Sequence, residues 1–188
     1  MTDNIYTQTY RRAIDMHESG TEQNEVLSYL ASAADTAAGT GTAASILLLD
    51  EHGVLRNGAS PRLPADYLEA IDGLKPDANV GTCAAAAATG NVVITPNFYA
   101  DNKWAELRHL PLALGYVAAW SVPIKNQDNK VIGTFGTYFR NYRQPSDEEV
   151  SGTQLLASAA AFILGNKIDK EYLTGSKTGH EIRSDQEQ

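Results

Sequence analysis

Apolar positions in the first forty residues recur with the period of an α-helix. Between Ile5 and His17 they lie three or four residues apart, and Gly20 ends this segment. Thr21 belongs to a residue type that caps helices, and the apolar stripe after it continues to Ala37. The pattern predicts two successive helices before any strand.

Short apolar runs bounded by turn residues follow, and they predict strands. The first two runs are joined by Glu51-His52-Gly53, which suits a hairpin turn, and the last two by the polar segment 126–129. In chain order, the five predicted strands cover residues 43–50, 54–59, 92–95, 116–124 and 130–139.

Between the second and fourth predicted strands the chain favours short helices. Pro64 and Gly73 bracket one of them, because proline suits a first helical position and glycine a terminus. A run of alanines predicts another over residues 82–89, which Gly90 stops.

The segment 97–115 contains too many breaks for one element. Two short helices, over 101–107 and 110–114, are expected there. Further on, Ser146 and Glu149 have the spacing of a capping box, which predicts the start of a long closing helix.

These elements place the chain in the α+β class. We expect one antiparallel sheet, with flanking helices on one face and short helices and loops on the other. Residues 1–20 form an N-terminal helix in this interpretation, and residues 21–172 form the main domain. Residues 173–188 are polar and are expected to be a disordered tail or the stub of a linker.

Composition narrows the function classes. The 188 residues suffice for one domain with a proper core, and the 43% hydrophobic content is that of a soluble globular chain. The net charge of -8 argues against a nucleic-acid partner, because phosphate binding needs a basic face.

Nothing in the sequence marks export or membrane insertion. The first twenty residues lack an apolar signal core, and no apolar run approaches the ~20 residues of a membrane helix. The one cysteine, Cys83, cannot form an internal disulfide, which suits a reducing compartment. We therefore expect a cytoplasmic protein.

Reactive side chains do not cluster. The histidines, at positions 17, 52, 109 and 180, show no paired spacing and no cluster of carboxylates accompanies them, so we expect no metal site, no cofactor and no catalytic residue. A buried, inert cysteine is the common case, and we assign Cys83 to it.

Six short motifs in a fixed order carry a resemblance. They are Gly81-Thr82-Cys83, Asp101-Asn102-Lys103-Trp104, Ala119-Trp120-Ser121-Val122-Pro123-Ile124, Ile132-Gly133-Thr134-Phe135, Tyr138-Phe139-Arg140 and Pro145-Ser146-Asp147-Glu148-Glu149. With them, residues 21–161 resemble the GAF sensory domains, in the branch that includes nitrate-binding receptors.

The resemblance implies a five- or six-stranded antiparallel sheet with a closed ligand pocket under loops and short helices. It also implies a homodimer formed through the terminal helices, and a regulatory partner such as a sensor kinase, a cyclase or a transcription factor. The ligand would be a small molecule, with an inorganic anion such as nitrate as one candidate, held largely by main-chain amides.

The candidate ligand-binding residues follow from this picture. The helix that starts near Thr82 offers unpaired N–H groups and a positive dipole end, and its alanines allow close approach. Two tryptophans could wall the cavity and supply an indole N–H each. The full set is Thr82, Cys83, Ala84, Ala85, Ile94, Tyr99, Trp104, His109 and Trp120, with His109 in the segment expected to cover the pocket.

Alternation leaves one orientation open. Trp120 shares a strand face with Val122, and Ala119 and Ser121 share the other, but both faces are apolar enough to be covered. The pattern therefore does not say whether Trp120 faces the pocket or the flanking helices. Similarly, Gly133 and Gly136 mark either room for a ligand or a bulge.

Two other functions stay open. The first is a thiol-dependent reductase of the GAF methionine-sulfoxide type using Cys83, although the second cysteine of those enzymes has no counterpart here. The second is a ligand-free module for dimerisation and protein interaction. This module predicts a pocket filled by its own side chains, whereas a sensor predicts a cavity of useful size. Attachment of a linear tetrapyrrole to Cys83 is disfavoured, because position 84 is alanine rather than histidine.

Overall fold

A computed structural model of the protein describes residues 4–175. The helices are α1 (Ile5–Glu18), α2 (Gln23–Ala38), α3 (Ala65–Ile71), α4 (Cys83–Thr89), α5 (His109–Ala113) and α6 (Asp147–Gly175), with a 3₁₀ turn η1 (Asn102–Trp104). The strands are β1 (Ala43–Leu49), β2 (Leu55–Ala59), β3 (Val93–Thr95), β4 (Ala118–Lys125) and β5 (Val131–Phe139).

The five strands form one sheet in the order β2-β1-β5-β4-β3, and every neighbouring pair is antiparallel. The predicted strands are therefore confirmed to within two residues at each end, and the sheet has five strands rather than six in the described part of the chain. The closing strand β5 lies between β1 and β4, so the C-terminal part of the domain occupies the middle of the sheet.

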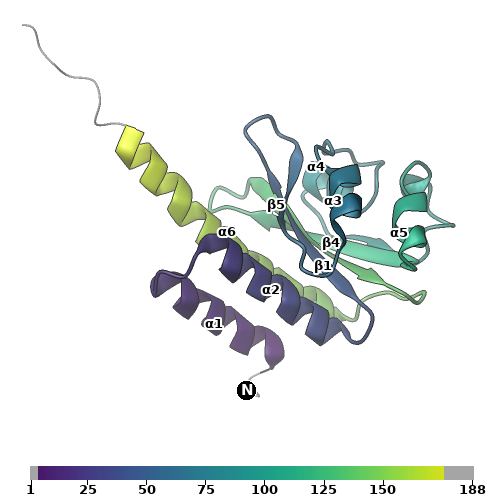
Figure 1. Ribbon diagram of the computed structural model, residues 1–188, viewed down its shortest axis with the longest axis horizontal. Coiled ribbons are helices and arrows are strands. Elements are labelled where there is room, and N and C mark those ends of the chain that lie inside the picture. The colour runs from purple at the N-terminus through teal and green to yellow at the C-terminus, as the bar shows by residue number, and fades with distance from the viewer. Residues whose placement is uncertain (1–3, 176–188) are drawn as a thin grey trace, which may run out of the picture.

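Two layers of helices cover the sheet (Figure 1). Helices α2 and α6 pack on one face, and α1 packs on these two helices. The short helices α3, α4 and α5 lie on the opposite face. Tyr6 and Ala13 of α1 belong to the same apolar core as residues of α2 and α6, so α1 shares the core of the main domain.

The helix ends show where local prediction succeeded. Ser146 and Glu149 form the expected capping box: the Glu149 N–H donates to Ser146 Oγ at 3.2 Å, and the Ser146 N–H donates to the Glu149 carboxylate at 2.7 Å. Thr21, however, does not cap α2. Its N–H donates to the Met16 carbonyl at 3.0 Å, beside Gly20 at φ 86°, so Thr21 completes the C-terminal turn of α1.

Strand alternation decides which side chains meet the long helices and which face the short ones. Trp120 and Val122 of β4 and Phe135 of β5 point toward α2 and α6, where they form one core. Ser121 and Gly136, which pair across the two strands, point to the other face. The open question about Trp120 is thereby answered: it faces the helices.

Helix α6 continues past the sheet and the α1–α2 pair (Figure 1). It extends to Gly175, so the boundary expected between residues 172 and 173 falls inside a helix. Residues 176–188 of the expected tail lie outside the described residues.

Candidate functional site

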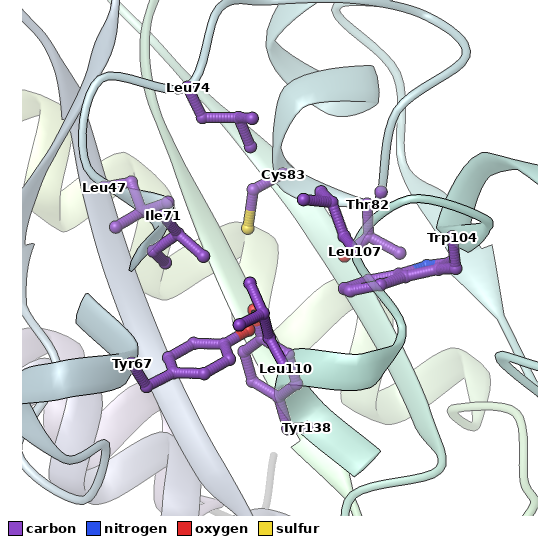
Figure 2. Close-up of a pocket in the computed structure, with 11 residues that line it drawn as sticks. Leu47, Tyr67, Ile71, Leu74, Thr82, Cys83, Trp104, Leu107, Leu110 and Tyr138 are labelled. Carbon is purple, nitrogen blue, oxygen red and sulfur yellow. The ribbon is translucent and has the colours of Figure 1, made fainter. Parts of the chain in front are cut away.

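A small cavity lies between the sheet and the short helices (Figure 2). Its volume is about 20 Å³, which is enough for the centre of roughly one water molecule. The lining residues come from β1, β5, α3, the start of α4, the segment between α3 and α4, and the segment between β3 and β4. They are Leu47, Tyr67, Ile71, Leu74, Gly81, Thr82, Cys83, Trp104, Leu107, Leu110 and Tyr138.

The cover of the cavity is a distinct segment. Leu107 and Leu110 belong to the stretch around η1 and α5, and both are only partly buried. Arg140 anchors the end of this stretch: its guanidinium donates to the Leu114 carbonyl at 2.5 Å and lies 4.6 Å from the centre of the Tyr116 ring. A ligand larger than water therefore requires the leucines of the cover to move.

Two phenols meet inside the cavity (Figure 2). The Tyr67 hydroxyl of α3 donates to the Tyr138 hydroxyl of β5 at 2.8 Å, and the rings meet edge to face. Burial raises the pKa of Tyr138 well above its ordinary value, and burial also raises the pKa of Tyr67. Both side chains are therefore neutral phenols over the physiological pH range.

Cys83 lies in a layer of hydroxyl groups on the floor of the cavity. Its sulfur is 3.1 Å from Ser121 Oγ, which in turn donates to Thr82 Oγ1 at 3.0 Å. Burial raises the pKa of the Cys83 thiol, so the nucleophilic thiolate is disfavoured. A Cβ atom on Gly136 would come within 2.9 Å of this sulfur, so the room that Gly136 leaves is filled by Cys83 and Ser121.

Helix α4 brings its backbone close to the sheet. Ala84 and Ala85 are buried but do not line the cavity, and α4 as a whole contacts β4 and β5. The first N–H to bond within the helix is that of Ala86, which donates to the Thr82 carbonyl at 2.8 Å. The N–H groups before it lack partners within the helix, as at any helix start. The helix has only seven residues.

Trp104 walls the cavity, but its N–H is already used. The indole donates to Thr95 Oγ1 at 3.2 Å, and Thr95 donates to the Asp101 carboxylate at 2.7 Å. Lys103 also pairs with Asp101, and its carbonyl accepts from the Gly81 N–H at 2.8 Å. In this structure the N–H of Trp104 therefore has a partner within the chain, in a network that also holds the cover in place.

Besides Ala84 and Ala85, four of the expected site residues do not line the cavity. Trp120 faces the helices, and Ile94 is its direct partner across β3 and β4, so Ile94 shares that face. Tyr99 is 60% exposed, because it sits on an open turn. His109 begins α5 on its solvent side. Thr82, Cys83 and Trp104 are the expected residues that the structure brings together.

The sequence interpretation missed the phenols and most of the apolar lining. Tyr138 follows from alternation once Trp120 is assigned to the helix face, since Tyr138 pairs with Ala119 on the other face. Tyr67 carries no comparable signal, because it is one apolar position on a short helix 71 residues away.

The described residues contain no group of three or more His, Cys, Asp or Glu side chains that could hold a metal ion. Within the same residues, no helix is long and apolar enough to cross a bilayer.

The model of a GAF domain family, GAF_2, matches residues 20–165. A "Methyl sulfide methyltransferase-associated sensor" from Methanosarcina acetivorans is 35% identical over 140 residues, which are 74% of this chain. The chain spans only 14% of the length of that relative.

Solved structures show the same fold. The GAF domain of a phosphoenolpyruvate-protein phosphotransferase from Coxiella burnetii matches with a TM-score of 0.73 and 14% identity, over 92% of this chain and 99% of that one. The reduced form of fRMsr from Staphylococcus aureus matches with a TM-score of 0.67 and 15% identity, over 85% of this chain and 94% of that one. The expected GAF-like α+β fold is confirmed.

Proposed function

Because the chain belongs to the GAF domain family, we propose that it is a sensory module that binds a small ligand in the cavity of Figure 2. One observation carries the proposal: an apolar cavity on the sheet is closed by a separate segment with its own anchors, Asp101 and Arg140. Such a segment can open and close without disturbing the core on the other face.

The end of β5 offers a route from the cavity to the terminal helices. Tyr138 lines the cavity, Phe139 lies in the helix-side core, and Arg140 holds the cover. Arg143 donates to the Ala38 carbonyl at the end of α2 and pairs with Glu149 at the start of α6. Displacement of the cover would thus reach both helices. The coupling cannot exceed the difference in ligand affinity between the two states.

The output in this proposal is a regulatory partner such as a sensor kinase or a cyclase, reached through a homodimer of the terminal helices. A curated relative that is named as a sensor supports the signalling role. Ile5 of α1 and Phe162 of α6 are exposed apolar residues on the helical layer, as a dimer contact requires.

We propose that the module is not an enzyme. Cys83 is the only cysteine of the sequence, it is buried, and its thiol has a raised pKa. These features oppose nucleophilic thiol chemistry. An assay of methionine sulfoxide reduction by the unmodified chain and by Cys83→Ser tests this directly. A thiol-dependent reductase would show an activity that Cys83→Ser abolishes.

Two ligand classes deserve the first assays. Nitrate would rely on the N–H groups at the start of α4, and methyl sulfide is suggested by the name of the curated relative and by the apolar lining. The experiment is a thermal-shift and calorimetric screen with nitrate, halides, dimethyl sulfide and common metabolites. A ligand that binds only the folded state raises the melting temperature.

A matched pair of variants localises any binding. Leu110→Trp fills the cavity from the cover, whereas Leu114→Trp adds the same ring to a residue of the same segment outside the cavity lining. Binding should be lost in the first variant and kept in the second. Equal loss in both, or no ligand in the whole screen, would contradict a sensory cavity.

The small volume of the cavity favours a second candidate, a ligand-free interaction module. A cavity of about 20 Å³ is nearly filled by its own side chains, as that alternative predicts. In this case Leu110→Trp would leave the regulation of the partner unchanged. For a sensor, the same variant would fix the output in one state.

A further inference from the structure

The hydroxyl proton of Tyr138 has no acceptor among the described residues. Tyr67 donates its own proton to the Tyr138 oxygen, and a phenol carries one proton only. No described hydrogen bond uses the proton of Tyr138, although this side chain is 4% exposed. Burial of an unpaired donor is costly, so an acceptor is expected to come from outside the chain.

The side chains around the Tyr138 hydroxyl limit the kind of molecule that can carry this acceptor. In Figure 2 the Tyr67 and Tyr138 oxygens lie together near the middle of the lining, with the Cys83 sulfur above them and Leu110 overlapping them in this view. The remaining walls are mostly aliphatic. A molecule that fills this space therefore has an apolar body around one polar atom.

Positive charge is absent from the described lining, which holds no Lys, Arg or His. The nearby cations of the cover are engaged elsewhere: Lys103 pairs with Asp101, and Arg108 donates to the Tyr99 carbonyl at 3.0 Å. An anion would lose its hydration here without gaining a countercharge. The pKa values of both phenols are raised chiefly by burial, which indicates that a negative charge at this place is unfavourable.

We infer that the ligand of this cavity is a small uncharged molecule with an apolar body and one hydrogen-bond acceptor, and that Tyr138 selects it by donating to that acceptor. Tyr67 is a positioning residue, because its donation directs the remaining proton of Tyr138 into the cavity and strengthens that donor. This inference rests on the sensory function proposed above and names its ligand class.

Three probes of equal size test the inference. Butanone is neutral with one carbonyl acceptor, 2-methylbut-1-ene replaces that oxygen by carbon, and propionate replaces the terminal methyl by a charged oxygen. Titrations followed by NMR on the isotope-labelled chain give the three affinities. We expect butanone to bind about three- to tenfold more tightly than the alkene, as one net hydrogen bond allows. Propionate should bind at least tenfold more weakly than butanone.

Two variants that each remove one oxygen supply the matched control. Tyr138→Phe should weaken butanone to the affinity of the alkene and leave the alkene unchanged. Tyr67→Phe keeps the Tyr138 proton, so butanone should still bind more tightly than the alkene. The preference of the unmodified chain for butanone over the alkene needs no variant, and it remains a test if a variant fails to fold.

The results that would contradict the role of Tyr138 differ from those that would contradict the proposed sensory function. Equal binding of butanone and the alkene, equal binding of propionate, or unchanged butanone affinity in Tyr138→Phe overturns the role of Tyr138. Binding of none of the probes to the unmodified chain also overturns it. The broad ligand screen can still succeed in any of these cases, and only its failure removes the sensory function.

Discussion

The two faces of the sheet are built from the same strands but differ in the size and chemistry of their side chains. Toward α2 and α6, Trp120 and Phe135 pack with Leu156 in a continuous apolar core. Toward the short helices, the same strands present Ser121 and Gly136 beside Leu47 and Tyr138, and hydrogen bonds of Asp101 and Arg140 hold the cover.

Because of this difference, we expect the helix face to contribute most of the stability and the cavity face to open more easily. Large apolar side chains stabilise in proportion to the area that they remove from water, about 25 cal/mol per Å². A floor of small and hydroxyl-bearing residues contributes less, but it lets α4 lie close to the sheet and leaves the cover to weaker anchors. Local opening is therefore expected on the cavity face while the helix face stays intact.

The largest expected loss of stability comes from truncating a side chain in the helix-side core, compared with truncation on the cavity face. Phe135→Ala, in the helix-side core, should lower the free energy of unfolding by about 3–5 kcal/mol. Leu110→Ala, on the half-buried cover, should cost only about 1–2 kcal/mol. Urea denaturation of both variants measures these values, and equal losses would remove the contrast between the faces.

A buried carboxylate is the exception on the helix side. Asp35 of α2 is 1% exposed, its Oδ2 lies 3.3 Å from Arg62 Nε, and burial raises its pKa from 3.8 to about 6, against the opposing effects of the Ala44 N–H and Arg62. Because the folded state binds the proton more tightly, ionised Asp35 lowers stability above pH 6, and this cost disappears as the pH falls toward 3.8.

Asp35→Asn should therefore stabilise the protein by about 1–3 kcal/mol at pH 8 and by much less at pH 4. Denaturation at the two pH values measures the difference. As a control, Arg62→Ala removes the countercharge and should destabilise at pH 8 but not at pH 4. A gain in Asp35→Asn that does not depend on pH would rule out ionisation as its cause.

Added volume on the cavity floor should have a smaller effect than truncation of Phe135 in the helix-side core. Gly136→Ala places a methyl against Cys83 Sγ and Ser121 Oγ and should cost about 1–3 kcal/mol. Cys83→Ala in the same chain should restore part of this loss, because it removes the nearer atom. Gly133→Ala is the matched comparison: its methyl would meet the Leu47 carbonyl oxygen, so Cys83→Ala should not rescue it. Equal rescue would contradict the assigned contacts.

The smallest effect on global stability is expected for the anchor of the cover. Asp101→Ala removes the acceptor of Thr95 and Lys103, which should ease local opening and speed alkylation of Cys83 by about 10–100-fold. Asp128→Ala removes an exposed carboxylate from a distant turn and should leave the rate unchanged. A rate that rises only in proportion to global unfolding would show that the cover does not open by itself.

Much of the fold could be predicted because its signals are local. The five strands, the α4 helix ended by Gly90 and the capping box at Ser146 follow from period, turn residues and spacing within a few residues. Thr21 was misassigned because a Schellman turn and a new helix compete for the same residue, and the hydrogen bond to Met16 decides between them.

The site was predictable only in part. Thr82, Cys83 and Trp104 lie in motifs that the family resemblance marked, and they line the cavity. Strand alternation shows which residues of a strand share a face with Trp120. It does not show whether that face meets the long helices or the cavity, because both faces are apolar. That choice needs the helices to be in place.

Periodicity and motif order were enough to predict the elements, their order, the α+β class and the family, since each depends on residues close together in the chain or on the order of short motifs. Two contacts could be known only from the folded chain. The Trp104 N–H donates to Thr95, and the hydroxyls of Tyr67 and Tyr138, 71 residues apart, meet so that the Tyr138 proton has no partner among the described residues. These are contacts set by strand register and helix packing, and local periodicity does not encode them.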